Sequence, residues 1–399
     1  MRLALFLLIP ALFAADPPKL PEPFRTLSDL ASAAPPEFAA DALLRMVESR
    51  KLADPAARRS LLEQAFQLAS AAKFPIRMQG VTGTTTDTAS GSLNDAYALG
   101  FDALSLQSRA VRDMLPLDPA KARALFTEIT RPALAPLTCD DALVYDPSAF
   151  YLALAAIDGS AFTPQEKAKD APFNLMLDEI GQMTSPSQIA PLAVAIESAS
   201  VTAIQRDHLR ARFNSLIQNM PADDRSLSAA PEQYRSKGHD CAAPKLDHYW
   251  QSATAKQLLD AGKKLRFGPR GQLADSDHSS AQWQQDLIDY LNLIAAWTPD
   301  QEPSPAIYFH ERCLVYTSLL DLVPSGPESE KILAEYVDFV GNSSLYDQSP
   351  GEWFVEPSKL LDRARTDRTR HAKVLNAFDR SGNPVLVLEV ALDRTFDTQ

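Results

Sequence analysis

Apolar residues recur three or four positions apart along most of this chain. Sets of this kind follow Pro147, Thr202 and Pro327, and they comprise Phe150, Leu154 and Ile157, then Leu209, Phe213, Leu216, Ile217 and Met220, and finally Ile332, Leu333, Tyr336, Val337 and Val340. The spacing places the apolar side chains of each segment on one face of an α-helix. Counting such segments along the whole chain predicts about fifteen helices.

The predicted helices begin with a shared local pattern, in which a capping residue precedes a proline. The pattern occurs at Asp54-Pro55, Asp118-Pro119, Asp146-Pro147 and Ser304-Pro305. Proline is tolerated at the first helical position because its missing N–H would have no partner inside the helix. Thr202, followed by Gln205, predicts a capping box. No segment alternates convincingly as a strand, and Asn383-Pro384 makes us expect a helix over Val385 to Leu392.

These patterns predict an all-α protein in which tandem helical hairpins stack into an irregular α-superhelix. We expect a signal peptide over residues 1–15, a helical domain over 16–222, a linker or long loop over 223–246, and a second helical domain over 247–399. The linker is polar and poor in apolar residues, which is why the boundary is placed there.

One internal similarity supports a repeat-like architecture. The segment Asp54 to Leu62 aligns with Asp118 to Phe126, with Asp, Pro, Ala, Arg and Leu at matching positions. Repeat architectures show such self-similarity at a fixed period. The next such start, Asp146-Pro147, comes too soon to keep that period, so shared capping chemistry is an alternative explanation.

Three segments carry a resemblance to known proteins: Leu117 to Ile129, Pro136 to Tyr151 (PLTCDDALVYDPSAFY) and Lys264 to Gly268. They are similar to pieces of uncharacterised exported bacterial α-helical proteins, loosely of the HEAT or tetratricopeptide kind. The resemblance implies helices and export, and it implies no activity.

The first fifteen residues have the layout of a secretory signal peptide. A short basic start at Met1 and Arg2 precedes an apolar run from Leu3 to Phe13, and the small residues Ala14 and Ala15 follow. The run is shorter than the roughly 20 residues that span a bilayer. The sequence therefore predicts export to the periplasm or the exterior, and no transmembrane segment after the leader is removed.

The charge balance narrows the classes of partner. The chain has 39 Lys and Arg against 51 Asp and Glu, a net charge of -12. Removing residues 1–15 takes away one arginine and no acid, which leaves -13. A body this acidic argues against nucleic acid or anionic lipid as the main partner.

One polar segment contains candidate metal ligands. His239, Cys241 and His248 could supply three ligands to a zinc ion, although their spacing fits no standard finger and a polar loop is the alternative. Cys139, Cys241 and Cys313 form no CxxC motif, so either one disulfide with one remaining thiol or buried thiols would fit. We expect no cofactor.

An aromatic stripe provides the other candidate site. Trp283, Tyr290 and Trp297 are seven residues apart and share one face of a predicted helix. They could form a platform for a sugar or a peptide, or a seam of the core, which is the usual role of an apolar stripe. Trp353 could be a similar anchor.

The functional prediction is a secreted, non-catalytic binding or scaffold protein for protein or peptide partners. Stacked helical hairpins offer extended surfaces for such partners, and the chain contains no G-x-S-x-G, P-loop or dinucleotide-binding motif. Two alternatives stay open: a hydrolase of an envelope polymer, which could use a metal bound near His239, Cys241, Asp247 and His248, and a structural envelope component.

Overall fold

A computed structural model describes most of the chain. The described residues are 20–72, 100–130, 147–220, 252–267, 278, 280–303, 305–343 and 355–396. The expected signal peptide, the expected linker over 223–246, and the predicted site residues His239, Cys241, His248 and Trp353 lie outside them. These predictions therefore stay predictions.

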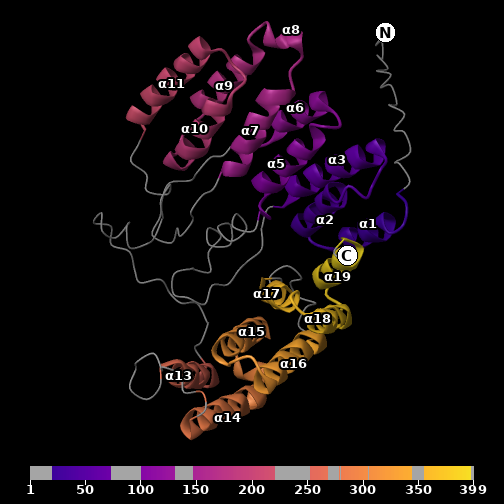
Figure 1. Ribbon diagram of the computed structural model, residues 1–399, viewed down its shortest axis with the longest axis vertical. Coiled ribbons are helices and arrows are strands. Elements are labelled where there is room, and N and C mark those ends of the chain that lie inside the picture. Colours follow the sequence, from indigo (N-terminus) through magenta and orange to yellow (C-terminus); the bar gives the residue numbers. More distant parts are fainter. Residues whose placement is uncertain are drawn as a thin grey trace, which may run out of the picture.

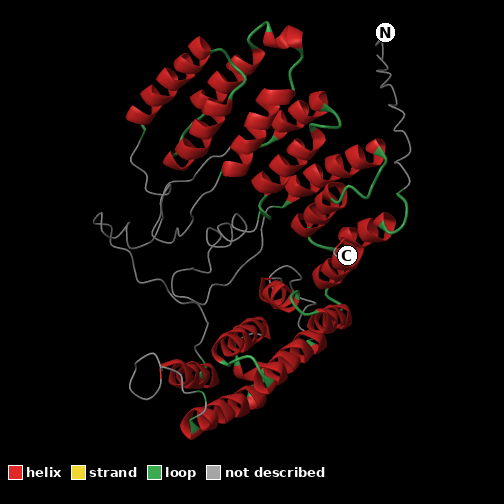
Figure 2. Ribbon diagram, viewed as in Figure 1, coloured by secondary structure: helices red, strands yellow, loops and turns green. Residues whose placement is uncertain are grey.

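The described residues form helices and connecting turns, with no strand among them (Figure 2). The first half contains α1 (Phe24–Ala33), α2 (Pro36–Glu48), α3 (Pro55–Ala71), α5 (Ala103–Met114), α6 (Pro119–Glu128), α7 (Ser148–Ser160), α8 (Pro164–Lys167), α9 (Ala171–Gly181), the short 3₁₀ helix η1 (Pro186–Gln188), α10 (Ile189–Ser198) and α11 (Ala203–Gln218). The second half contains α13 (Ala253–Phe267), α14 (Ala281–Ala296), the short 3₁₀ helix η3 (Pro299–Gln301), α15 (Pro305–Leu322), α16 (Pro327–Asn342), α17 (Val355–Ala364), α18 (Arg368–Ser381) and α19 (Pro384–Phe396). The predicted all-α class is confirmed.

The capping chemistry read from the sequence explains several helix starts. The Asp54 carboxylate accepts a hydrogen bond from the backbone N–H of Ala56, and Asp118 accepts one from Lys121, with proline next in the chain in both cases. Thr202 and Gln205 form the predicted capping box at the start of α11. Each cap satisfies a backbone N–H that has no partner inside its helix.

Two further helices begin next to a proline. Helix α7 begins at Ser148, and Pro147 is the residue before it, so the prediction that Pro147 occupies the first helical position was wrong by one residue. The segment from Val385 to Leu392 lies inside α19, as expected. Its start is capped by Asn383, whose side-chain oxygen accepts from the N–H groups of Val385 and Leu386.

Helices pack mainly on their neighbours in the chain. Contacts run from α1 through α2, α3, α5 and α7 to α10 and α11, and separately from α13 and α14 through α15 and α16 to α18 and α19. The consecutive described helices α11 and α13 lie well apart (Figure 1). These contacts show that neighbouring helices stack on each other. The superhelical path of the stack stays a prediction.

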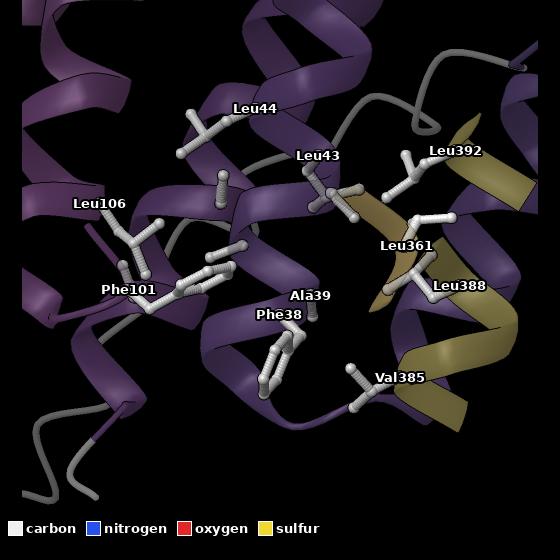
Figure 3. Packing of buried hydrophobic residues seen from close by; sticks show 14 of the residues in the cluster. Phe38, Ala39, Leu43, Leu44, Phe101, Leu106, Leu361, Val385, Leu388 and Leu392 are labelled. Carbon is white, nitrogen blue, oxygen red and sulfur yellow. The ribbon is translucent and has the colours of Figure 1, made fainter. Parts of the chain in front are cut away.

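The C-terminal helix joins the two series. Helix α19 contacts both α1 and α2, so the first and last described helices lie side by side (Figure 1). Val385, Leu388 and Leu392 of α19 approach Ala39 and Leu43 of α2 (Figure 3). These side chains are at most 2% exposed, and each buried Leu or Val contributes roughly 1.5–3 kcal/mol. Both predicted domains thus contribute to one continuous hydrophobic cluster.

A charged contact accompanies this apolar junction. Arg45 of α2 donates to both carboxylate oxygens of Glu389 of α19, at 3.0 and 2.9 Å. Burial raises the pKa of Glu389, while the nearby Arg45 opposes that rise. Both hydrogen bonds come from one guanidinium nitrogen, Nη1, and this charge-assisted contact ties α2 to α19. Within the described part of the chain, no helix is both long and apolar enough to cross a membrane.

Candidate functional site

The aromatic stripe predicted from the sequence is part of the interior. Trp283 and Tyr290 lie on α14 and Trp297 follows its last residue, with exposures of 8%, 3% and 1%. Leu287 and Ile294 are buried on the same helix. The three aromatic side chains are therefore part of the hydrophobic core, which was one of the two predicted alternatives. Their rings form no open platform at the surface.

Trp297 nevertheless organises a polar site at the end of α14. Its indole Nε1 donates to Glu302 Oε1 at 2.8 Å, and the Ser252 hydroxyl donates to the same oxygen. Its backbone carbonyl accepts from the Tyr308 hydroxyl and from Arg312 Nη1, each at 3.0 Å. A cation beside the last carbonyls of a helix is favourable, because the helix dipole is negative there.

Arg312 of α15 lies in an aromatic cage formed by residues of α15 and α16. Its guanidinium carbon lies 4.8 Å from the ring centroid of Phe339 and 5.6 and 5.7 Å from those of Tyr308 and Tyr316. It also donates to both tyrosine hydroxyls. Burial by itself would lower the pKa of the Arg312 guanidinium, but the two hydroxyls raise it, so the group stays charged. Ring faces stabilise such a cation.

The caged arginine lines a hollow of about 580 Å³, which we call the Arg312 hollow. Most of its wall comes from helices α15 and α16 and from Ser343, which follows α16. The residues are Tyr308, Arg312 and Tyr316 on α15, Glu335 and Phe339 on α16, and Ser343. Polar groups of both charges therefore meet over an aromatic floor. This combination is typical of sites that orient a ligand by a few polar contacts.

Several polar groups in the Arg312 hollow lack partners among the described residues. Among the residues that the structure describes, no carboxylate lies within 4 Å of the Arg312 guanidinium and no cation lies within 4 Å of Glu335. Arg312 Nε and the Ser343 hydroxyl are enclosed and make no hydrogen bond there. Unmade hydrogen bonds of buried groups are costly, at about 1–3 kcal/mol each.

A second hollow lies between α16 and α18, and all of its charged residues except Lys373 form ion pairs with each other. It measures about 280 Å³ and includes Asp338, which also lines the Arg312 hollow. Arg370 forms an ion pair with Glu330, and Arg380 forms one with Asp338 at 3.4 Å. Because these pairs use the groups that a ligand would need, the second hollow is the weaker candidate.

A third polar group joins α2 to α5. Arg109 donates to Asp41 and to both oxygens of Glu48. Burial, followed by the negative charge of Glu48, raises the pKa of Asp113 to about 7. Burial opposes the shift at Glu48, but the hydrogen bonds from Arg109 hold its pKa below the usual value. Two neighbouring carboxyl groups with separated pKa values can act as an acid and a base.

The metal prediction is not tested by the described residues. They contain no group of three or more His, Cys, Asp or Glu side chains placed to hold a metal ion. Cys313 is completely buried within α15, whereas Cys139 and Cys241 lie outside the described residues. The pairing of the three cysteines stays open.

The sequence reasoning missed Arg312 and Glu335. A signal was present, because Tyr308, Arg312 and Tyr316 recur every fourth residue and so share one face of a helix. Their meeting with Glu335, Phe339 and Ser343 depends on how α15 packs on α16, which no local pattern reports.

Comparisons with known proteins add no further identification. No family model matches the chain, and neither the curated proteins nor the solved structures give a significant match to it. The functional argument therefore rests on the geometry of the described residues.

Proposed function

We propose that this chain is an exported, non-catalytic binding protein whose helical surface holds a protein or peptide partner. The observation that carries the proposal is the Arg312 hollow. It combines a caged guanidinium and a half-buried carboxylate, neither of which has an opposite charge within 4 Å among the described residues. A partner that supplies the missing contacts would bind there with defined orientation.

The test is site-specific crosslinking in the exported, full-length protein. A photoreactive residue at Asn342, which is exposed and lines the Arg312 hollow, is compared with one at Gln67, which is exposed on α3. The two helices lie in different parts of the molecule (Figure 1). We expect Asn342 to capture one or two partners near stoichiometry, and Gln67 to capture none of them.

Two controls make the result decisive. Cell fractionation establishes that the protein is exported, and circular dichroism of the purified variants establishes that they are helical. If the exported and folded Asn342 variant captures no partner above the level of the Gln67 variant, the binding-protein proposal fails.

A hydrolase of an envelope polymer is the second candidate. Its support is the Glu48–Asp113 pair, whose pKa values lie apart. Asp113→Asn should abolish hydrolysis of a cell-wall polymer if this pair is catalytic, while His248→Ala and metal analysis of the full chain address a metal centre. Wild-type protein that hydrolyses no envelope polymer would eliminate this candidate.

A further inference from the structure

The Arg312 hollow lacks hydrogen-bond acceptors at one end. Arg312 uses three N–H donors on Trp297 O, Tyr308 Oη and Tyr316 Oη, which leaves two of the five donors of a guanidinium. The Ser343 hydroxyl is a further group without a partner among the described residues, and Ser343 is only 8% exposed. Because Nε and the Ser343 hydroxyl are both enclosed, the remaining Nη2 N–H is the donor left for the acceptor oxygen of a ligand.

The other side of the hollow is negative. Glu335 is half-buried with no cation within 4 Å among the described residues, and the exposed Asp338, one helical turn further on, is already paired with Arg380. Helix α16 ends at Asn342, so its negative end also faces this region. A bare anion would be repelled here, although Arg312 alone would attract one.

A ligand must therefore combine a cationic group with a nearby neutral acceptor. A peptide with a lysine or arginine side chain has both, because its backbone carbonyls accept hydrogen bonds next to the charged side chain. The net charge of -12 also favours encounter with a basic partner over an acidic one.

We infer that the Arg312 hollow binds a basic segment of a partner protein, with Glu335 pairing with a lysine or arginine side chain and Arg312 donating to a backbone carbonyl. The inference rests on the proposed binding function and names the chemistry of the partner. It makes Glu335 the specificity-determining residue, and Arg312 a contact that does not select between side chains.

The experiment uses the full exported chain and four pools of labelled random peptides of equal length. The central residue is fixed as Lys, Arg, Gln or Glu, and binding is measured by fluorescence polarisation. We expect the Lys and Arg pools to bind at least about tenfold more tightly than the Gln and Glu pools. Glu335→Gln should remove this preference, and rising salt should weaken it.

Matched variants separate the contacts. Glu328→Gln makes the same change on an exposed residue of α16 outside the hollow, and we expect it to leave the preference intact. Ser343→Ala, at an enclosed hydroxyl that a peptide does not reach, should leave the binding of all four pools unchanged. Circular dichroism shows that each variant is folded.

The outcomes distinguish this inference from the proposed function. A preference for the Glu pool, a preference that survives Glu335→Gln, or four pools that all fail to bind would each overturn the basic-peptide inference. The binding function would stand in those cases if Asn342 still captures a partner by crosslinking. It would fail only if that capture fails.

Discussion

Asp102 offers a test of the packing at the start of α5. The residue is 1% exposed, and its carboxylate Oδ1 accepts a hydrogen bond from the backbone N–H of Ser105 at 2.8 Å. The second oxygen, Oδ2, is buried with no hydrogen-bond partner among the described residues. Burial raises the pKa of Asp102 from 3.8 to about 6, against the opposing hydrogen bonds from Ser105.

The expected effect follows from this pKa difference of about 2. Because the folded pKa is the higher one, the folded protein binds the proton more tightly, and stability falls as the pH rises from about 4 to 7. At 1.4 kcal/mol for each pH unit, the ionised carboxylate destabilises the folded state by about 3 kcal/mol at neutral pH. Asp102→Asn keeps the capping oxygen and removes the charge.

The measurement is urea unfolding of wild type and Asp102→Asn, followed by the helical circular-dichroism signal. The Asn amide leaves a donor unpaired at a cost of about 1–3 kcal/mol, but that cost does not vary with pH. We therefore expect the free energy of unfolding of the variant, relative to wild type, to fall by about 2 kcal/mol between about pH 7 and pH 4.

Asp54→Asn is the matched control, since Asp54 caps α3 from an exposed position. A difference between wild type and Asp102→Asn that is the same at both pH values would refute the reasoning. It would mean that water or another group solvates the Asp102 carboxylate in the folded protein.

Three further predictions concern helix contacts. In Gly341→Ala, the new Cβ would lie 3.0 Å from Ala377 Cβ, so α16 and α18 must separate. We expect the free energy of unfolding, measured by heat or urea, to fall by about 1–3 kcal/mol, although alanine favours the helix by about 1 kcal/mol over glycine. Glu389→Ala removes both hydrogen bonds that Arg45 donates to Glu389, while Asp41 stays 3.8 Å from the same nitrogen, and it should cost about 1–3 kcal/mol. Pairing it with Arg45→Met should restore part of the loss, and equal losses in the single and double variants would argue against the pair. Arg312→Met removes three hydrogen bonds and should cost about 2–4 kcal/mol, and an unchanged unfolding midpoint would contradict the cage.

Local patterns were sufficient for the helices themselves. The caps at Asp54, Asp118 and Thr202 and the apolar face of α16 were readable from the sequence, because helix starts and amphipathic faces depend on residues only a few positions apart. Where the pattern was wrong, at Pro147, the error was a single residue, within the usual uncertainty of helix boundaries.

The candidate site could not be predicted in the same way. The stripe of Trp283, Tyr290 and Trp297 was visible, but the same spacing suits a platform and a core seam. Packing decided between them, because neighbouring helices cover the rings. The charged residues that the hollow exposes, Arg312 and Glu335, carry no motif of their own.

By itself, the sequence determined the all-α class, several helix starts and the acidic charge of the protein. Each of these depends on composition or on residues within one or two helical turns. Only the tertiary structure decided that α19 packs against α1 and α2, and that Arg312, Glu335 and Ser343 line the same hollow. Those contacts join residues from separate helices, and they are selected by the shapes of whole helix faces, which no short stretch of sequence encodes.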